Sequence, residues 1–159
     1  MQQILISFLG TGNYVPVCYR LNERVYERTK YIQEVLIRGL CEGWQANSDR
    51  IVFFATPKSR KTSWEGDTGA GCTAKDARSL RARLKELNLP LEPDLQIIPD
   101  GATREEFWEL FRLFINCLDR DWKVYLDIPH AFRSLPMLAM VGLNNATVAK
   151  GVSFGGIYY

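Results

Sequence analysis

The chain has 159 residues, 47% of them apolar, which is enough to bury the core of one globular domain and excludes a disordered chain. Its formal net charge of +2 excludes non-specific binding of polyanions over the whole surface, so any site for an anion must be local. The opening stretch has no charged segment ahead of its apolar residues and is too short for a membrane span. We therefore expect a cytoplasmic protein with no membrane partner.

The four cysteines show none of the paired spacings that are typical of a zinc site; they are Cys18, Cys41, Cys72 and Cys117. We interpret them as reduced thiols that serve as small buried apolar side chains. The sequence accordingly predicts neither a metal nor another cofactor.

The predicted elements begin with two apolar strands and a helix between them. Residues 3–9 and 50–56 are continuous apolar runs, which favours buried strands of a parallel sheet. Between these strands, alternating residues around 21–22 predict a hairpin, and Thr29 is placed to cap the following helix. Residues 57–76 are polar and rich in glycine, and they predict a long loop of the kind that is often functional.

The second half of the chain continues the same alternation. Thr103 and Glu106 have the spacing of a capping box, which predicts the start of a helix. The predicted elements are a helix over 77–87, a strand at 95–99, a helix over 103–118, a strand at 123–128, a helix from about 134 to 145 and a strand at 151–159. This order predicts an α/β fold: one Rossmann-like domain over residues 1–159, with a mostly parallel sheet and helices on both faces.

The end of the first strand carries residues that suit a ligand, because open α/β sheets bind ligands at the carboxyl ends of their strands. Gly10 and Gly12 let the backbone approach a ligand closely, and Thr11 and Asn13 offer hydrogen bonds. A plain tight turn explains the same residues equally well.

A second strand end lies in the stretch YLDIPHAFRSLP, which contains the chain's only histidine. Asp127 closes the strand, and the helix that follows begins with free backbone N–H groups that attract an anion. Arg133 adds a permanent positive charge, and His130 can donate a hydrogen bond or move a proton. Each residue also has a structural explanation: Asp127 as a turn cap, His130 as a buried histidine and Arg133 as half of a surface ion pair.

At these residues the sequence resembles the CRISPR-associated Rossmann fold, or CARF, domain, which is the sensory domain of type III CRISPR ancillary proteins. The stretches that carry the resemblance are LISFLGTGNY, RTKYIQEVL, VFFAT and above all YLDIPHAFRSLPML. The resemblance implies a homodimer that binds a cyclic oligoadenylate across its twofold axis, with cyclic tetra-adenylate favoured over cyclic hexa-adenylate. It also implies an effector domain, fused or separate, which this sequence does not contain.

The resemblance assigns ligand contacts to both strand ends and to the flanking loop; they are Gly10, Thr11, Gly12, Asn13, Thr56, Lys58, Trp64, Asp127, Pro129, His130, Ala131, Phe132 and Arg133. Two positions depart from the family pattern, which usually has threonine at Pro129 and glycine at Ala131. The loss of a hydroxyl at one position and the added methyl at the other put the size of the ring and its cleavage in doubt.

Two functions remain open from the sequence. The first is a sensor that only binds the messenger. The second is a ring nuclease that cleaves it without a metal by attack of a ribose 2′-OH, with His130, Arg133 and Lys58 as catalytic candidates. The glycine turn lacks the third glycine of a dinucleotide site, which disfavours an oxidoreductase, and no basic recognition helix predicts direct DNA binding.

Overall fold

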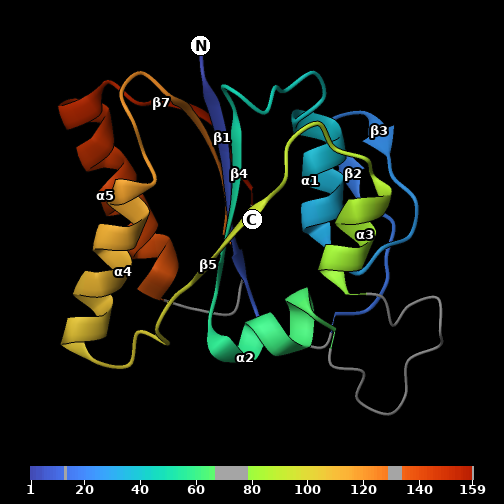
Figure 1. Ribbon diagram of the computed structural model, residues 1–159, viewed down its shortest axis with the longest axis horizontal. Coiled ribbons are helices and arrows are strands. Elements are labelled where there is room, and N and C mark those ends of the chain that lie inside the picture. The colour runs from blue at the N-terminus through green and yellow to red at the C-terminus, as the bar shows by residue number, and fades with distance from the viewer. Residues whose placement is uncertain (13, 67–78, 129–133, 159) are drawn as a thin grey trace.

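The computed structural model describes residues 1–12, 14–66, 79–128 and 134–158, and these residues form an α/β fold around one five-stranded sheet (Figure 1). The strands are β1 (Gln3–Leu9), β4 (Arg50–Ala55), β5 (Asp94–Ile97), β6 (Lys123–Asp127) and β7 (Ser153–Tyr158). Their order is β5-β4-β1-β6-β7, and all neighbours pair in parallel. The predicted Rossmann-like architecture is confirmed.

Helices cover both faces of the sheet, as Figure 1 shows. The helices on one face are α1 (Ile32–Leu40) and α3 (Leu80–Glu86), and those on the other are α4 (Arg104–Asn116) and α5 (Ser134–Lys150). The predicted hairpin is present as the two short strands β2 (Arg20–Leu21) and β3 (Arg24–Val25). None of the described helices has the length and apolar character to cross a bilayer.

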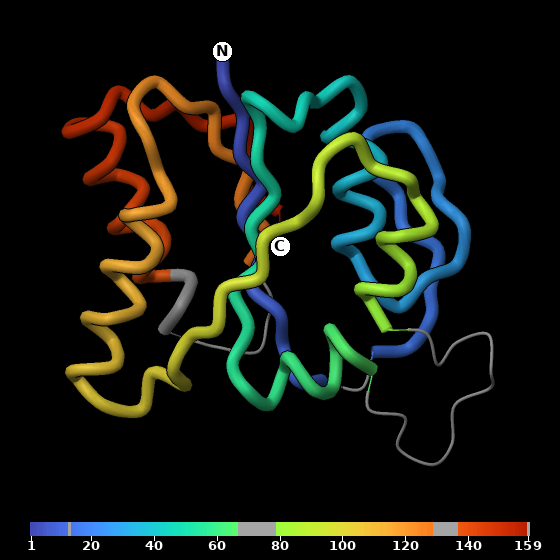
Figure 2. The backbone as a smooth tube through the Cα atoms, viewed as in Figure 1, coloured from blue at the N-terminus to red at the C-terminus, as the bar shows by residue number. Residues whose placement is uncertain are grey.

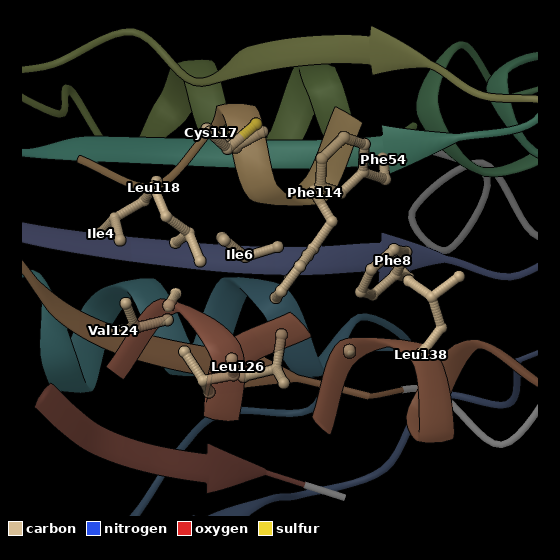
Figure 3. Packing of buried hydrophobic residues seen from close by; sticks show 14 of the residues in the cluster. Ile4, Ile6, Phe8, Phe54, Phe114, Cys117, Leu118, Val124, Leu126 and Leu138 are labelled. Atoms are coloured by element: carbon tan, nitrogen blue, oxygen red, sulfur yellow. The ribbon is translucent and has the colours of Figure 1, made fainter. Parts of the chain in front are cut away.

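The alternation of side chains along β1 divides the core into two layers. Ile4, Ile6 and Phe8 face α4 and α5, while Leu5 and Leu9 face α1 and α3. Because both faces are covered, β1 reads in the sequence as a continuous apolar run. Figure 3 shows the first layer, where the Phe8 ring stacks on the rings of Phe54 and Phe114, with centroids 5.2 and 6.3 Å away.

Helix α4 begins as its sequence predicts. The Thr103 hydroxyl accepts a hydrogen bond from the Glu106 N–H at 3.2 Å, and the Glu106 carboxylate accepts one from the Thr103 N–H at 3.4 Å. The capping box is therefore confirmed. The start of α1 differs, because Tyr31 is its N-cap and Thr29 lies outside the helix, where its hydroxyl accepts from the Tyr31 N–H at 3.2 Å.

The segment after β4 is helical where the sequence predicted a loop. Helix α2 (Pro57–Ser59) continues into a π-helical turn, η1 (Arg60–Trp64). Thr56 starts this segment, since its hydroxyl accepts from the Ser59 N–H at 3.2 Å and Pro57 occupies the first helical position. The prediction of a loop is therefore wrong for residues 57–64, because the Thr56 cap begins a helical segment there, whereas residues 67–76 of the predicted loop lie outside the described residues.

Two smaller expectations also change. Helix α5 extends past the predicted end near residue 145 to Lys150 and stops at Gly151, whose positive φ of 69° suits a glycine. Among the cysteines, Cys41 and Cys117 are buried as expected, but Cys18 is exposed. Cys72 lies outside the described residues.

Gly142 allows α4 and α5 to approach closely, and we predict that Gly142→Val destabilises the protein. A Cβ atom at this position would lie 2.8 Å from the ring of Phe114, which is itself buried in the core. Overpacking of this kind costs about 1–3 kcal/mol. Urea denaturation of Gly142→Val measures the loss, and Ala149→Val on the exposed end of α5 is the control. Equal stability of the two variants would contradict the close contact.

Candidate functional site

The candidate site lies where the strand order reverses. From β1 the chain adds β4 and β5 on one side of the sheet and later β6 and β7 on the other. The carboxyl ends of β1 and β6 therefore form the topological switch point, at which open α/β sheets bind ligands. The smooth trace of Figure 2 shows β1 and β4 running out toward α2 at this edge of the sheet.

The strand register brings three strand ends together at this edge. Ser7 of β1 pairs with Asp127 of β6, and Leu9 of β1 pairs with Ala55 of β4. Gly10 thus leaves the sheet beside Thr56 on one side and shortly beyond Asp127 on the other. The ends of β1, β4 and β6 therefore share one edge of the sheet, where Gly10, Thr56 and Asp127 are described.

Asp127 is a buried carboxylate with neutral hydrogen-bond partners. Its Oδ2 accepts from the Ser7 hydroxyl at 2.6 Å and from the Gln33 amide at 3.0 Å, and the residue is 3% exposed. Burial raises the pKa of Asp127 from 3.8 to about 6, and the two hydrogen bonds limit that rise. Through these two hydrogen bonds, Asp127 joins the carboxyl end of β6 to β1 and α1.

The bend after β1, at residues 10–12, is held by the helical segment that follows β4. The Gly10 carbonyl accepts from the Ser63 hydroxyl at 2.7 Å, and the Ser63 carbonyl accepts from the Tyr31 hydroxyl at 3.2 Å. Thr11 is half-buried and Gly12 is exposed just beyond this contact. The bend is therefore fixed at its base and open at its tip.

The three flanking residues take different positions. Thr56 is buried, and its hydroxyl is engaged in capping α2. Lys58 is exposed on α2 at the carboxyl edge, where its charge is accessible to an anion. Trp64 is 8% exposed and packs on Phe53 with the ring centroids 5.3 Å apart, so its main contact is the core.

The remaining predicted site residues lie outside the described residues; they are Asn13, Pro129, His130, Ala131, Phe132 and Arg133. The described chain reaches Ile128 on one side of the second bend and resumes at Ser134 on the other. Their assignment as ligand contacts therefore stays a prediction. Among the described residues, no three His, Cys, Asp or Glu side chains gather as metal ligands.

Sequence reasoning missed four residues around Asp127. Ser7 and Gln33 bond its carboxylate directly, and Tyr14 and Tyr19 lie near enough to sense its charge. Burial, followed by the charge of Asp127, raises the pKa of both tyrosines. The sequence did offer one signal for Tyr14, which stands two positions after Gly12 of the glycine turn. In the structure its ring lies close to that glycine, 3.7 Å from where a Cβ atom at Gly12 would be.

Comparison with known proteins links part of the chain to CRISPR systems. No protein-family model matches the chain. Over 67 residues, 40% of the chain, it is 42% identical to the CRISPR-associated protein MJ1674 of Methanocaldococcus jannaschii. The match spans 11% of the length of that protein. The chain is therefore a partial homologue of a CRISPR-associated protein.

Proposed function

We propose that this chain is a CARF-type sensor domain that binds a cyclic oligoadenylate messenger in type III CRISPR signalling. Cyclic tetra-adenylate is the favoured ligand, with cyclic hexa-adenylate as the alternative ring. The observation that carries the proposal is the switch point itself, where the register places the ends of β1 and β6 side by side. The partial identity to a CRISPR-associated protein supports the same biological setting.

The described residues at this edge suit a sugar-phosphate ligand. Gly10 and Gly12 leave room for the backbone to approach a phosphate, and the tip of their bend is exposed. Backbone N–H groups and a few basic side chains hold phosphates without a large net charge, in keeping with the overall value of +2. Lys58 is an exposed cation at the same edge.

The proposed ligand also explains why the protein should be a homodimer. A ring of repeated nucleotides presents equivalent phosphates on opposite sides. Two identical half-sites related by a twofold axis match this symmetry, and each subunit then supplies the same strand ends. One subunit alone would bind only half of the ring.

Calorimetric titration with cyclic tetra-adenylate and cyclic hexa-adenylate tests the proposal. Arg133→Ala and His130→Ala are each expected to weaken binding about 10- to 100-fold, because each removes a hydrogen bond to a charged phosphate worth about 1.5–3 kcal/mol. Arg112→Ala, an exposed arginine on α4, is the matched control and should bind like the unaltered chain. Affinity that is unchanged in both site variants would refute the assignment.

The same ligands distinguish a sensor from a ring nuclease. Incubation with labelled rings and separation of the products shows whether they stay intact. A nuclease would convert them to linear fragments that end in a 2′,3′-cyclic phosphate, because the 2′-OH attacks phosphorus and the 5′-oxygen of the next nucleotide leaves. We expect the rings to remain intact, and linear products would replace the sensor with the nuclease.

A further inference from the structure

A cleft lies between α3 and the start of β5, on the flank of the sheet away from β6. It has a volume of about 330 Å³ and is lined by α3, by the turn that follows this helix and by Trp64 at the end of η1. Figure 1 shows the turn at the upper end of α3, where the chain crosses to β5. The lining includes no residue from the ends of β1 or β6. The volume is at the lower end of the range for ligand sites, so the cleft suits a small ligand.

The cleft has an apolar floor, formed by Trp64, Leu84, Leu89 and Leu91. Trp64, Leu84 and Leu91 are 8%, 4% and 5% exposed, and Leu89 is half-buried. The Trp64 ring packs on Phe53 with the ring centroids 5.3 Å apart, so the core holds the indole in place. An apolar floor that is already in position binds an apolar or aromatic body, because it removes the surface of that body from water.

Two cations of α3 border the floor. Arg81 and Lys85 are one helical turn apart and exposed, and both line the cleft. Within the described part of the chain, neither side chain has an ion-pair or hydrogen-bond partner. Arg83 lies between them in the sequence but faces α1, where it pairs with Glu34 at 2.6 Å. The helix therefore uses one cation for an internal ion pair and leaves two at the cleft.

The charge of the cleft is unevenly divided between its walls. The turn contributes one acid, Glu92, and the amide of Asn88, whereas α3 contributes Arg81 and Lys85. Two cations and one acid leave one net positive charge. The α3 wall is therefore the place for an anionic group, and the turn can accept a hydrogen bond from the body of the ligand.

We infer that this cleft binds a small organic anion, namely an apolar or aromatic body that carries one phosphate or carboxylate. The body lies on the apolar floor, and the anionic group lies at Arg81 and Lys85. The planar guanidinium of Arg81 can bind either group with two hydrogen bonds, and Lys85 adds a second positive charge. Neither part of the ligand binds well alone, because the floor is small and the cations are open to water.

Calorimetric titration with four probes tests the inference. The probes 1-naphthyl phosphate and 1-naphthoate have an aromatic body and an anionic group, whereas 1-naphthol lacks the charge and inorganic phosphate lacks the body. We expect each of the first two to bind at least about tenfold more tightly than either of the last two, because only they engage both the floor and the cations. The tighter of the two anionic probes identifies the preferred group.

The double change Arg81→Ala and Lys85→Ala should weaken the binding of 1-naphthyl phosphate about tenfold or more and leave that of 1-naphthol as it is. Both residues are exposed, so the variant should fold, which circular dichroism checks. Arg104→Ala with Arg112→Ala, two exposed arginines of α4, is the matched control. Arg133→Ala, at the proposed messenger site, should also keep the affinity of the unaltered chain.

Four outcomes would overturn the inference. They are equal affinity for the charged and neutral probes, binding that survives the double change, no binding of either anionic probe at millimolar concentration, and a loss of binding in Arg133→Ala. The last outcome would place the anion at the proposed messenger site instead. Because none of the probes is a cyclic oligoadenylate, failure of the proposed function would leave this test unchanged.

Discussion

Asp127→Asn should flatten the pH dependence of the free energy of unfolding between about pH 4 and pH 6. Burial raises the pKa of Asp127 from 3.8 to about 6, with Ser7 and Gln33 as its neutral partners. The folded protein therefore holds this proton more tightly than the unfolded chain. The resulting stabilisation is complete below pH 3.8 and is lost as the pH rises through about 6. A shift of this size corresponds to about 3 kcal/mol.

Urea denaturation at a series of pH values from 4 to 7 measures this effect in the unaltered chain and in Asp127→Asn. The difference in unfolding free energy between the two should change by about 3 kcal/mol across the series, in favour of the asparagine variant at the higher pH. Asp100→Asn makes the same change at an exposed position and should leave the slope as it is. If the unfolding free energy of Asp127→Asn depended on pH as it does in the unaltered chain, the protonation of Asp127 would not be the source of this dependence.

The ionised Asp127 carboxylate lowers the stability of the fold at neutral pH, and this residue lies at the proposed binding site. A buried acid with only neutral hydrogen-bond partners destabilises the fold when it is ionised. Groups of this kind gather at binding sites more often than elsewhere, because the site needs their geometry. Asp127 sits directly beneath the switch point and joins β1, β6 and α1, so its cost coincides with the edge that we propose to bind the messenger.

Local patterns predicted the fold well because they record burial and capping. The apolar run of β1 and the capping box of α4 depend on neighbouring residues alone, and both are confirmed. The partners of Asp127 could not be predicted in this way, since Ser7 and Gln33 are 120 and 94 positions away in the chain. The helical segment after β4 was missed for a related reason, because the burial of Trp64 depends on its packing against Phe53.

Glu34→Ala should lower the free energy of unfolding by about 3 kcal/mol, the lower end of the range for breaking a buried ion pair. The Glu34 carboxylate accepts from the Arg83 guanidinium at 2.6 Å and from the Thr29 hydroxyl at 2.9 Å. The side chain of Glu34 is 8% exposed and that of Arg83 is 22% exposed. Water therefore solvates the Arg83 guanidinium poorly once the Glu34 carboxylate is removed. The pair joins α3 to the first turn of α1.

The control for this change is an ion pair of similar geometry on the surface. Arg60 and Glu65 lie 2.8 Å apart with side chains 51% and 42% exposed, so Glu65→Ala should cost less than about 1 kcal/mol. Thermal or urea unfolding of both variants measures the difference. If both variants lost a similar amount of unfolding free energy, burial would not increase the contribution of the Glu34–Arg83 ion pair to stability.

The position of Glu34 in α1 extends its effect to the site. Gln33, the preceding residue, donates the amide hydrogen bond that holds down the pKa of Asp127. If the first turn of α1 loosens in Glu34→Ala, that bond weakens and the pKa of Asp127 rises further. The loss of stability with rising pH should then extend above pH 6 in this variant. An unmoved pH profile would show that α1 keeps Gln33 in place without the ion pair.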